Sequence, residues 1–292
     1  MKNIVFLAAS LISVSLNAQY YYNDIIGTQE INNKMKTYLS AKVQSVTATG
    51  YDPMGTKSPD FNEWQDVQAN GSVLKITTRT GQDVARTYYQ FDNNIRLISA
   101  RDSSTDAESV TTYAYDAGNN LVNIRTTTKD PLHDFDQTKE RQWNYKEGKP
   151  VKLLLIVNGT DSMLYSFTVD ERKNVVDEMI SHRGGAQNKL DYLYDPNKIY
   201  YFYDDQNRLT DITKYNVKAD RLIPDYMFTY DDKGQVIQRI TVLSSARLPD
   251  YFTWRYAYNE KGLKTKEVLY GKKKEATDDL KGKIEYSYTF AQ

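Results

Sequence analysis

One short motif recurs through this chain and limits what it can fold into: an aromatic residue, any residue, usually a second aromatic, then an acidic or amide residue. Between Asp92 in the first copy and Asn259 in the last, the copies are spaced by about 28 residues, which is the spacing of a repeat architecture. Each repeat of this length corresponds to one supersecondary unit that packs against its neighbours. The copies begin at Tyr89, Tyr113, Trp143, Phe167, Tyr201, Phe228 and Tyr256.

Each copy predicts a β-hairpin. In the first strand the large aromatic side chains fall two residues apart, as in Trp254, Tyr256 and Tyr258. Alternate side chains of a strand point to opposite faces, so such a set lines one face. The residues between them, Arg255 and Ala257, are polar or small. This alternation is typical of a half-buried antiparallel strand.

The end of each motif predicts a tight turn that leads into a return strand. Asp231 and Asn259 begin turns in which the side chain can accept a bond from the backbone two residues on. Gly or Asn near the end of a turn accepts a positive φ at low cost, as a hairpin loop closed by a left-handed residue requires. In the copy that ends at Val169, Asn174 comes later than usual. The other candidate turn residues are Asn94, Gly118, Gly148, Asn207, Gly234 and Gly262.

The repeats resemble the YD repeats of the RHS family, whose signature is Tyr-x-Tyr-Asp-x-x-Gly-x-Leu. Tyr113 to Leu121 and Tyr201 to Leu209 match it with Asn in the Gly position, and Phe228 to Val236 matches it with Val in place of Leu. The resemblance covers roughly residues 46–292 and implies a continuous antiparallel sheet in a secreted or surface protein, often closed into a shell. This chain has only about eight copies and no segment that resembles the family's core or an appended toxin.

From these features we expect an all-β fold: an antiparallel meander of YD-type hairpins in residues 46–292, as a curled or two-layered sheet of about fifteen strands. Arg239, Lys264 and Lys266 are expected to reach solvent. The core should hold the aromatic side chains, namely Tyr113, Tyr115, Tyr201, Tyr203, Phe228, Tyr230, Tyr256 and Tyr258. Residues 20–45 form a separate N-terminal segment, with a short helix predicted from Thr28 to about Lys42. The residues Tyr20, Tyr21 and Tyr22 fit no repeat, which leaves disorder as one interpretation of that stretch.

Residues 1–19 are predicted to be a secretory signal peptide. Lys2 supplies a positive start, an apolar stretch follows to Ile12, and Ala18 offers a small residue for cleavage, which would leave Gln19 as the new N-terminus. The alternative is a buried N-terminal strand. The Asn-Ala-Gln ending resembles that of many Bacteroidetes exports. We therefore expect an exported protein that is periplasmic, on the outer surface or extracellular, with no transmembrane segment in the mature chain.

The composition of the chain limits the classes of partner that it is expected to bind. The chain has 38 basic and 38 acidic residues, so no global field favours nucleic acid. The sequence has no cysteine, so an exported form would contain neither a disulfide nor a lipid-modified cysteine. A lipid-facing barrel is disfavoured because the mean hydropathy is −0.68 and charges fall inside the predicted strands. These charged residues are Arg125, Arg239, Lys264, Lys266 and Glu285.

No catalytic, cofactor-binding or metal-binding residues are predicted. The two histidines, His133 and His182, fall in predicted inter-repeat loops and have no metal-ligand spacing. Neighbouring acids are interpreted as turn residues rather than as a glycosidase pair or a dedicated Ca²⁺ loop. Those pairs are Asp204 with Asp205, Asp231 with Asp232, and Asp278 with Asp279.

The sequence thus favours an exported, non-catalytic protein with a binding or structural role at the cell envelope or exterior. Two alternatives remain: a carbohydrate-binding protein that uses exposed aromatic residues, and a hydrolase without a recognisable motif. No cofactor is predicted. No motif specifies a binding partner. The two classes of partner considered are a glycan and an envelope protein.

Overall fold

The computed structural model describes residues 19–104, 107–130, 133–183, 198–216, 220–243, 250–272 and 278–292. Residues 1–18, which carry the predicted signal peptide, lie outside the described residues. The described chain begins with a π-helical segment, η1 (Tyr21–Ile26), that continues directly into helix α1 (Gly27–Ser40). The predicted helix is therefore confirmed. Within the described ranges, no helix is both long enough and apolar enough to cross a membrane.

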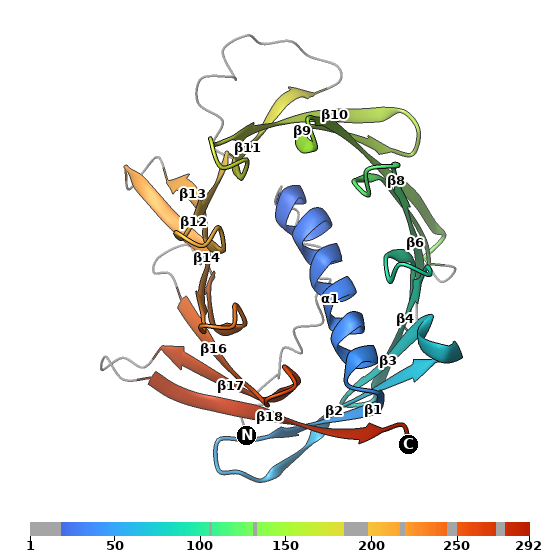
Figure 1. Cartoon of the computed structure of the whole chain (residues 1–292), viewed down its shortest axis with the longest axis vertical. Helices are drawn as coiled ribbons and strands as arrows, with labels where there is room; N and C mark the ends of the chain where they lie inside the picture. Colours follow the sequence, from blue (N-terminus) through green and yellow to red (C-terminus); the bar gives the residue numbers. More distant parts are fainter. Residues whose placement is uncertain are drawn as a thin grey trace.

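The repeats form one closed antiparallel barrel of eighteen strands over the described residues (Figure 1). Each strand pairs with its neighbours in the sequence, and the last strand pairs with the first. A short 3-10 turn, η2 (Ala69–Gly71), follows β2 and leads into β3. The strands are β1 (Val43–Tyr51), β2 (Lys57–Gln68), β3 (Val73–Thr80), β4 (Asp83–Phe91), β5 (Leu97–Ser103), β6 (Glu108–Tyr115), β7 (Leu121–Asp130), β8 (Phe135–Lys146), β9 (Lys149–Val157), β10 (Asp161–Val169), β11 (Val175–Arg183), β12 (Ile199–Tyr203), β13 (Leu209–Asn216), β14 (Arg221–Tyr230), β15 (Val236–Leu243), β16 (Asp250–Tyr258), β17 (Lys264–Lys272) and β18 (Asp278–Phe290).

The all-β antiparallel meander is confirmed, but the expected curled or two-layered sheet is wrong. The seam between β1 and β18 pairs Val46 with Tyr288, so the sheet is a single layer whose two edges meet. Closure removes the unpaired edges that an open sheet would expose. The aromatic face is covered by α1 inside the ring rather than by a second sheet layer (Figure 1).

The YD turns that begin with Asp or Asn have one geometry, whereas the turn after Lys146 is a two-residue loop with positive φ at Glu147 and Gly148. In each of the Asp or Asn turns, the side chain of the Asx residue accepts a hydrogen bond from the backbone N–H two residues later, four residues later, or both. Asp231, for example, accepts from Lys233 at 3.0 Å and from Gln235 at 2.8 Å. The third residue after the Asx residue always has a positive φ. These residues are Gly55, Ile95, Asn119, Lys173, Asn207, Gly234 and Gly262. Asn94, Gly118 and Asn174 were therefore assigned one place from the left-handed position.

In the repeats whose second aromatic residue is tyrosine, its hydroxyl joins the repeat to the preceding one; Phe91 and Val169 occupy this position in two other copies. The second aromatic residue of a motif donates its hydroxyl to the backbone carbonyl that opens the preceding return strand; Tyr230, for example, donates to Leu209 at 2.7 Å. The same bond joins Tyr115 to Leu97, Tyr145 to Leu121, Tyr203 to Val175, Tyr258 to Val236 and Tyr288 to Lys264. The second aromatic position of one repeat signature is thus bonded to the backbone at the leucine position of the preceding repeat, so this contact links neighbouring repeats.

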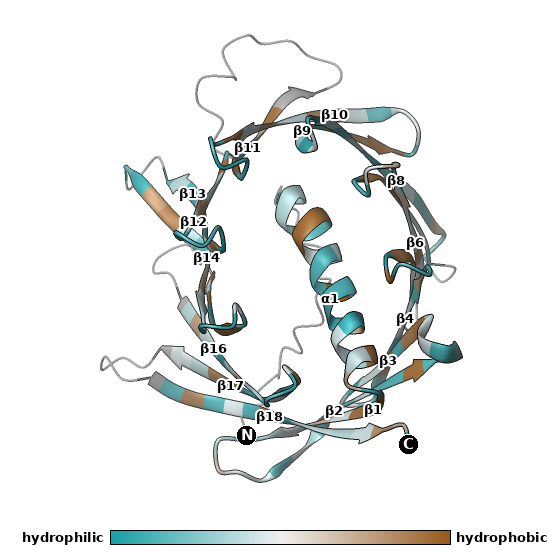
Figure 2. Cartoon of the chain, viewed as in Figure 1, coloured by the Kyte–Doolittle hydropathy of each residue, from teal (hydrophilic) through white to brown (hydrophobic). Residues whose placement is uncertain are grey.

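Hydrophilic and hydrophobic residues alternate along several strands (Figure 2). The inner wall holds the buried aromatic rings, and the outer wall is mostly polar. Of the eight aromatic residues predicted for the core, Tyr201 and Phe228 are buried, and the other six are half-buried. Arg239 and Lys264, which were predicted to reach solvent, lie on the inner wall, where the Lys264 side chain is still 34% exposed. Arg239 is paired with Phe228 on the inner wall, and Lys264 lies 4.6 Å from the ring centre of Tyr256.

The N-terminal segment crosses the ring from one wall to the other (Figure 1). Its first residues pack into a hydrophobic cluster with β8 to β15, where Tyr22 is buried. The later turns of α1 pack Met35 and Tyr38 against β1 to β5 and the last strands. Disorder of Tyr20 to Tyr22 is therefore not observed. Two of these rings pack edge-to-face on the wall, with ring centres 4.8 Å apart for Tyr20 and Tyr165 and 5.3 Å apart for Tyr21 and Tyr201.

Candidate functional site: the barrel lumen and its rim

A buried carboxylate receives the start of the helical segment. Glu178 of β11 is 0% exposed, and its two oxygens accept the backbone N–H groups of Tyr20 at 3.0 Å and Tyr21 at 3.1 Å. The hydroxyl of Tyr201 donates to the same carboxylate at 2.8 Å. The first N–H groups of a helix have no partner within the helix, and a carboxylate there also complements the helix dipole. Burial raises the pKa of Glu178 to about 7, although these three hydrogen bonds favour the charged form.

The residue before this segment is also fixed to the wall. Gln19 is buried, and its side-chain amide donates to Asp225 of β14 at 2.8 Å. Asp225 in turn forms an ion pair with Lys214 of β13 at 2.6 Å. The carbonyl of Gln19 accepts the N–H of Asn23 at 2.8 Å, so the helical hydrogen bonds begin at Gln19.

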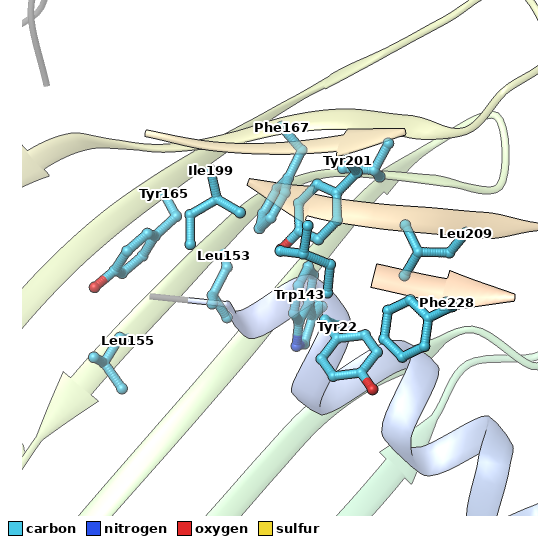
Figure 3. Packing of buried hydrophobic residues seen from close by; sticks show 12 residues of the cluster. Tyr22, Trp143, Leu153, Leu155, Tyr165, Phe167, Ile199, Tyr201, Leu209 and Phe228 are labelled. Carbon is cyan, nitrogen blue, oxygen red and sulfur yellow. The ribbon is translucent and has the colours of Figure 1, made fainter. Parts of the chain in front are cut away.

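A second buried acid, Asp24, joins the helical segment to β8. Its carboxylate accepts Arg141 at 2.7 Å and the indole N–H of Trp143 at 3.2 Å. Burial raises the pKa of Asp24, and the neighbouring Arg141 charge opposes that rise. Figure 3 shows how Trp143 and Tyr22 lie beside each other above the strands in this cluster, where Trp143 also stacks on Phe167 at 5.0 Å. The polar contacts are thus enclosed by aromatic rings, which limits competition from water.

A third polar group lies on the opposite wall, near the later turns of α1. Lys264 and Glu267 of β17 form an ion pair at 2.6 Å, and Tyr286 donates its hydroxyl to Glu267 at 2.8 Å. Burial alone would raise the pKa of Glu267, but the Lys264 charge holds it below its usual value. The hydroxyl of Tyr38 in α1 donates to Gln65 of β2 at 2.8 Å. Both ends of the helix are therefore held by hydrogen bonds to inward-facing polar side chains.

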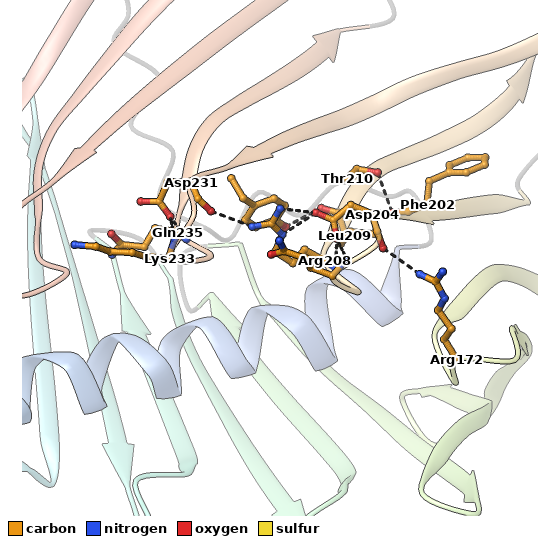
Figure 4. A network of polar contacts seen from close by, with 11 residues as sticks. Arg172, Phe202, Asp204, Arg208, Leu209, Thr210, Asp231, Lys233 and Gln235 are labelled. Atoms are coloured by element: carbon orange, nitrogen blue, oxygen red, sulfur yellow. Dashed lines mark hydrogen bonds and ion pairs between the residues drawn. The ribbon is translucent and has the colours of Figure 1, made fainter.

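The YD turns are also bonded to one another along one rim (Figure 4). Arg208 holds Asp204 of its own turn at 2.7 Å and donates to the carbonyl of Asp231 in the next turn at 3.0 Å. Arg172 of the preceding turn donates to the carbonyl of Asp204 at 3.4 Å. The guanidinium of Arg208 also lies 4.8 Å from the ring centre of Tyr230. Of the paired acids, Asp204 and Asp231 serve this turn geometry, as predicted. The turn prediction was wrong for Asp278 and Asp279, whose backbone belongs to β18, where Asp279 forms an ion pair with Lys281 at 2.8 Å.

The outer wall has a shallow groove and a few exposed rings. The groove, of about 450 Å³, lies on β7, β8 and β9 and is lined by Arg125, Asp136, Thr138, Glu140, Ile156, Asn158 and Gly159, without an aromatic ring. Trp64, Phe202 and Tyr251 are exposed on separate parts of the ring, at 39%, 42% and 38%. The structure does not bring these rings together on neighbouring strands.

The histidine whose side chain the structure describes, His133, lies beside a single acid. His133 is exposed in the turn after β7 and contacts Asp130 at 2.7 Å. His182 was predicted in a loop, but its backbone belongs to β11; its side chain lies outside the described residues. In the described part of the chain no group of three His, Cys, Asp or Glu side chains is placed to hold a metal ion.

The lumen residues Glu178, Asp24 and Gln19 were not identified from the sequence. One signal was present for Glu178. Glu178 is an acidic residue on a predicted return strand. A charge on the buried face of such a strand is costly unless a partner forms hydrogen bonds with it, so an acid there indicates a partner. The partner, the helical segment at Tyr20, belongs to a stretch that no repeat explained.

These features define a closed antiparallel barrel that encloses its own N-terminal segment. No family model matches the chain, and no curated protein matches it. Among solved structures, the chain is similar to a porin-like protein from Bacteroides uniformis ATCC 8492, with 8% identity and a TM-score of 0.38, over 85% of this chain and 98% of that one. It is also similar to a porin-like protein from Bacteroides vulgatus ATCC 8482, with 11% identity and a TM-score of 0.28, over 85% and 98% of the two chains.

A further similarity is to the Photorhabdus luminescens Tc holotoxin pore, with 15% identity and a TM-score of 0.35. It covers 77% of this chain and 13% of that chain. At these TM-scores the superpositions carry no argument about function, which is therefore argued from the residues of this chain.

Proposed function

We propose that the chain is an exported, non-catalytic barrel that works in water at the cell envelope or exterior, in a binding or structural role. The observation that carries this proposal is the polar outer wall. A row of directly paired residues crosses nine neighbouring strands on that wall: Gln68, Val73, Gln90, Ser99, Thr112, Arg125, Glu140, Ile156 and Ser162.

This row does not fit a lipid-facing surface. A barrel that spans a membrane needs an apolar outer band about 25 Å tall, and a charged Arg or Lys in the middle of that band costs about 2–4 kcal/mol. Arg125 and Glu140 lie at the middle of β7 and β8, and Ile124 on the opposite face is buried. On the other side of the ring, outer residues Lys266 and Glu285 are paired across β17 and β18.

The contents of the lumen support a non-catalytic role. An enzyme presents titratable groups to a substrate in a cleft. Here Glu178 and Asp24 are buried and already bonded to the helical segment and to wall residues. The acids of the turns face water at the rim. The hydrolase alternative would need a histidine beside buried acids, and His133 contacts a single acid at the surface.

The carbohydrate-binding alternative retains one supporting observation, the exposure of Trp64, Phe202 and Tyr251 on the outer wall. Sugar rings stack on aromatic faces, so a binding platform would use these three positions. A glycan array probed with the mature protein tests this alternative. Binding that Trp64→Ala or Phe202→Ala abolishes would replace the proposal of a general binding or structural role with a carbohydrate-binding one.

Export and solubility are tested together by fractionating cells that express the full chain. We expect the protein outside the cytoplasm, shortened by the signal peptide, and extracted by buffer without detergent. The purified protein should not float with phosphatidylcholine vesicles in a density gradient. Retention in the membrane fraction until detergent is added would contradict a water-facing outer wall, and full-length protein in the cytoplasm would contradict export.

A further inference from the structure

The Glu178 site contains a charge that no cation balances. Among the described residues, its partners are the N–H groups of Tyr20 and Tyr21 and the hydroxyl of Tyr201, all of them neutral donors. The nearest acid that acts on it, Asp24, is of the same sign and already has Arg141. A fully buried carboxylate without an opposite charge is expensive, because hydrogen bonds replace only part of its lost hydration.

The chain has a latent cation next to this site. Gln19 precedes Tyr20 in the same helical turn, because its carbonyl accepts the N–H of Asn23. The nitrogens of a first helical turn all point towards the N-terminal end of the helix, where Glu178 lies. The nitrogen of Gln19 is an uncharged amide as long as the chain continues before it. It becomes an ammonium group when the bond to Ala18 is broken.

We propose that the α-ammonium group of the processed chain, on Gln19, is the counter-ion of Glu178. The inference rests on the proposed export, with cleavage after Ala18. In that cleavage a signal peptidase adds water across the Ala18–Gln19 bond: the carbonyl carbon of Ala18 takes the hydroxyl, and the nitrogen of Gln19 takes the proton and then one more from solvent. The new cation forms a charge-assisted hydrogen bond, which is stronger than the neutral ones already present.

Gln19 is held for this role by its own side chain. The amide donates to Asp225, whose charge is balanced by Lys214, so Asp225 does not compete for the ammonium group. Gln19 is itself buried, so the contact is shielded from solvent. Removal of the signal peptide would thus supply the last charge of the barrel core, and the barrel would become fully stable only after processing.

The test is a double-mutant cycle on the mature barrel with defined N-termini. One form begins at Gln19, released from a fusion partner by a protease that leaves no extra residue; the other carries a Gly-Ser-Gly-Ser extension before Gln19. Each is made with Glu178 and with Glu178→Gln. We expect the free terminus to raise Tm by about 4 °C in the Glu178 protein, from the coupling free energy typical of contacting groups and the shift in Tm that it produces in a domain of this size. In Glu178→Gln this gain should disappear.

A gain of equal size in Glu178→Gln, or no gain in the Glu178 protein, would overturn the inference. A second measurement uses the protein without any substitution. It is the rate at which an amine-specific acylating reagent labels the α-amino group at neutral pH. An ion-paired ammonium must lose its proton before it reacts, so we expect labelling about tenfold slower in the native than in the urea-unfolded protein. Equal rates would also overturn it.

Intact mass separates this inference from the proposed export. If the protein recovered from its host is not cleaved after Ala18, the export proposal fails, while the cycle on defined termini still decides whether Glu178 binds an α-ammonium group. If the native terminus has lost ammonia by cyclisation of Gln19, its nitrogen is a neutral lactam, and the inference is overturned even though export stands. Glu140→Gln serves as the control, because Glu140 lies on the outer wall and bonds only Asn123 and Gln142 among the described residues, so the gain from the free terminus should persist in it.

Discussion

The turn at Gly234 allows the backbone contribution to stability to be measured almost alone. Gly234 has φ of 78°, and a Cβ atom added there would meet nothing within 4 Å. Any loss of stability on substitution therefore reports the left-handed conformation and not a clash. That conformation costs an ordinary residue about 1–2 kcal/mol, and a β-branched residue more. We expect Gly234→Ala to destabilise the barrel by about 1 kcal/mol and Gly234→Val by about 2 kcal/mol.

The matched control is Gly27, at the start of α1. Its Cβ would meet only the carbonyl of Tyr22, at 3.6 Å, and its φ is helical at −60°. Gly27→Ala should therefore stabilise the protein by about 0.5–1 kcal/mol, by restricting the unfolded chain. Asn207→Gly, at the equivalent place in another turn, should be neutral or slightly stabilising. Urea unfolding of the mature protein measures all four variants, and a Gly234→Val protein as stable as the parent would refute the turn geometry described above.

Further predictions concern the bonds between repeats and within the lumen. Tyr230→Phe removes the hydroxyl that donates to the carbonyl of Leu209 and should cost about 1 kcal/mol in urea unfolding, with an unchanged circular dichroism spectrum. Asp24→Asn leaves Arg141, whose side chain is 20% exposed, without its acid and should cost about 3 kcal/mol, the lower end for a broken buried pair. In the N-terminally extended form, Glu178 has a folded pKa of about 7, above its unfolded value of 4.5, so the folded state binds more protons. Stability should therefore be greatest below pH 4.5 for this group and fall as the pH rises to about 7; Glu178→Gln should lose that slope, and an unchanged slope would argue against Glu178 as its source.

The sequence predicted the repeating unit because its local chemistry is complete within a few residues. Asp231 and Gly234 specify a turn by themselves, and the alternation at Tyr256 and Tyr258 specifies which face is buried. Ile95 was missed as the left-handed residue because a β-branched side chain is strained at positive φ, and only the equivalent positions of the other repeats reveal it.

The features that depend on distant partners could not be predicted in this way. Closure of the ring depends on pairing between β1 and β18. The sequences of these two strands do not differ in kind from those of the other strands, so nothing in them marks the pair. Arg239 and Lys264 were expected in solvent because they are charged, but the lumen provides partners for Lys264 and aromatic rings beside Arg239. The role of Glu178 depends on Tyr20 and Tyr21, which lie outside the repeats and find their binding site only after the wall has formed.

The seam between β1 and β18 also sets an order of events in time. Ser45 and Thr289 are hydrogen-bonded across this seam although they lie 244 residues apart in the sequence. Contacts of such high sequence separation form slowly, because the whole intervening chain must first be ordered. Under the export proposed above, the ring would close only after its last strand had crossed the export channel. Until then the residues that later lie in the lumen would remain open to solvent, which would give a peptidase time to reach the bond before Gln19.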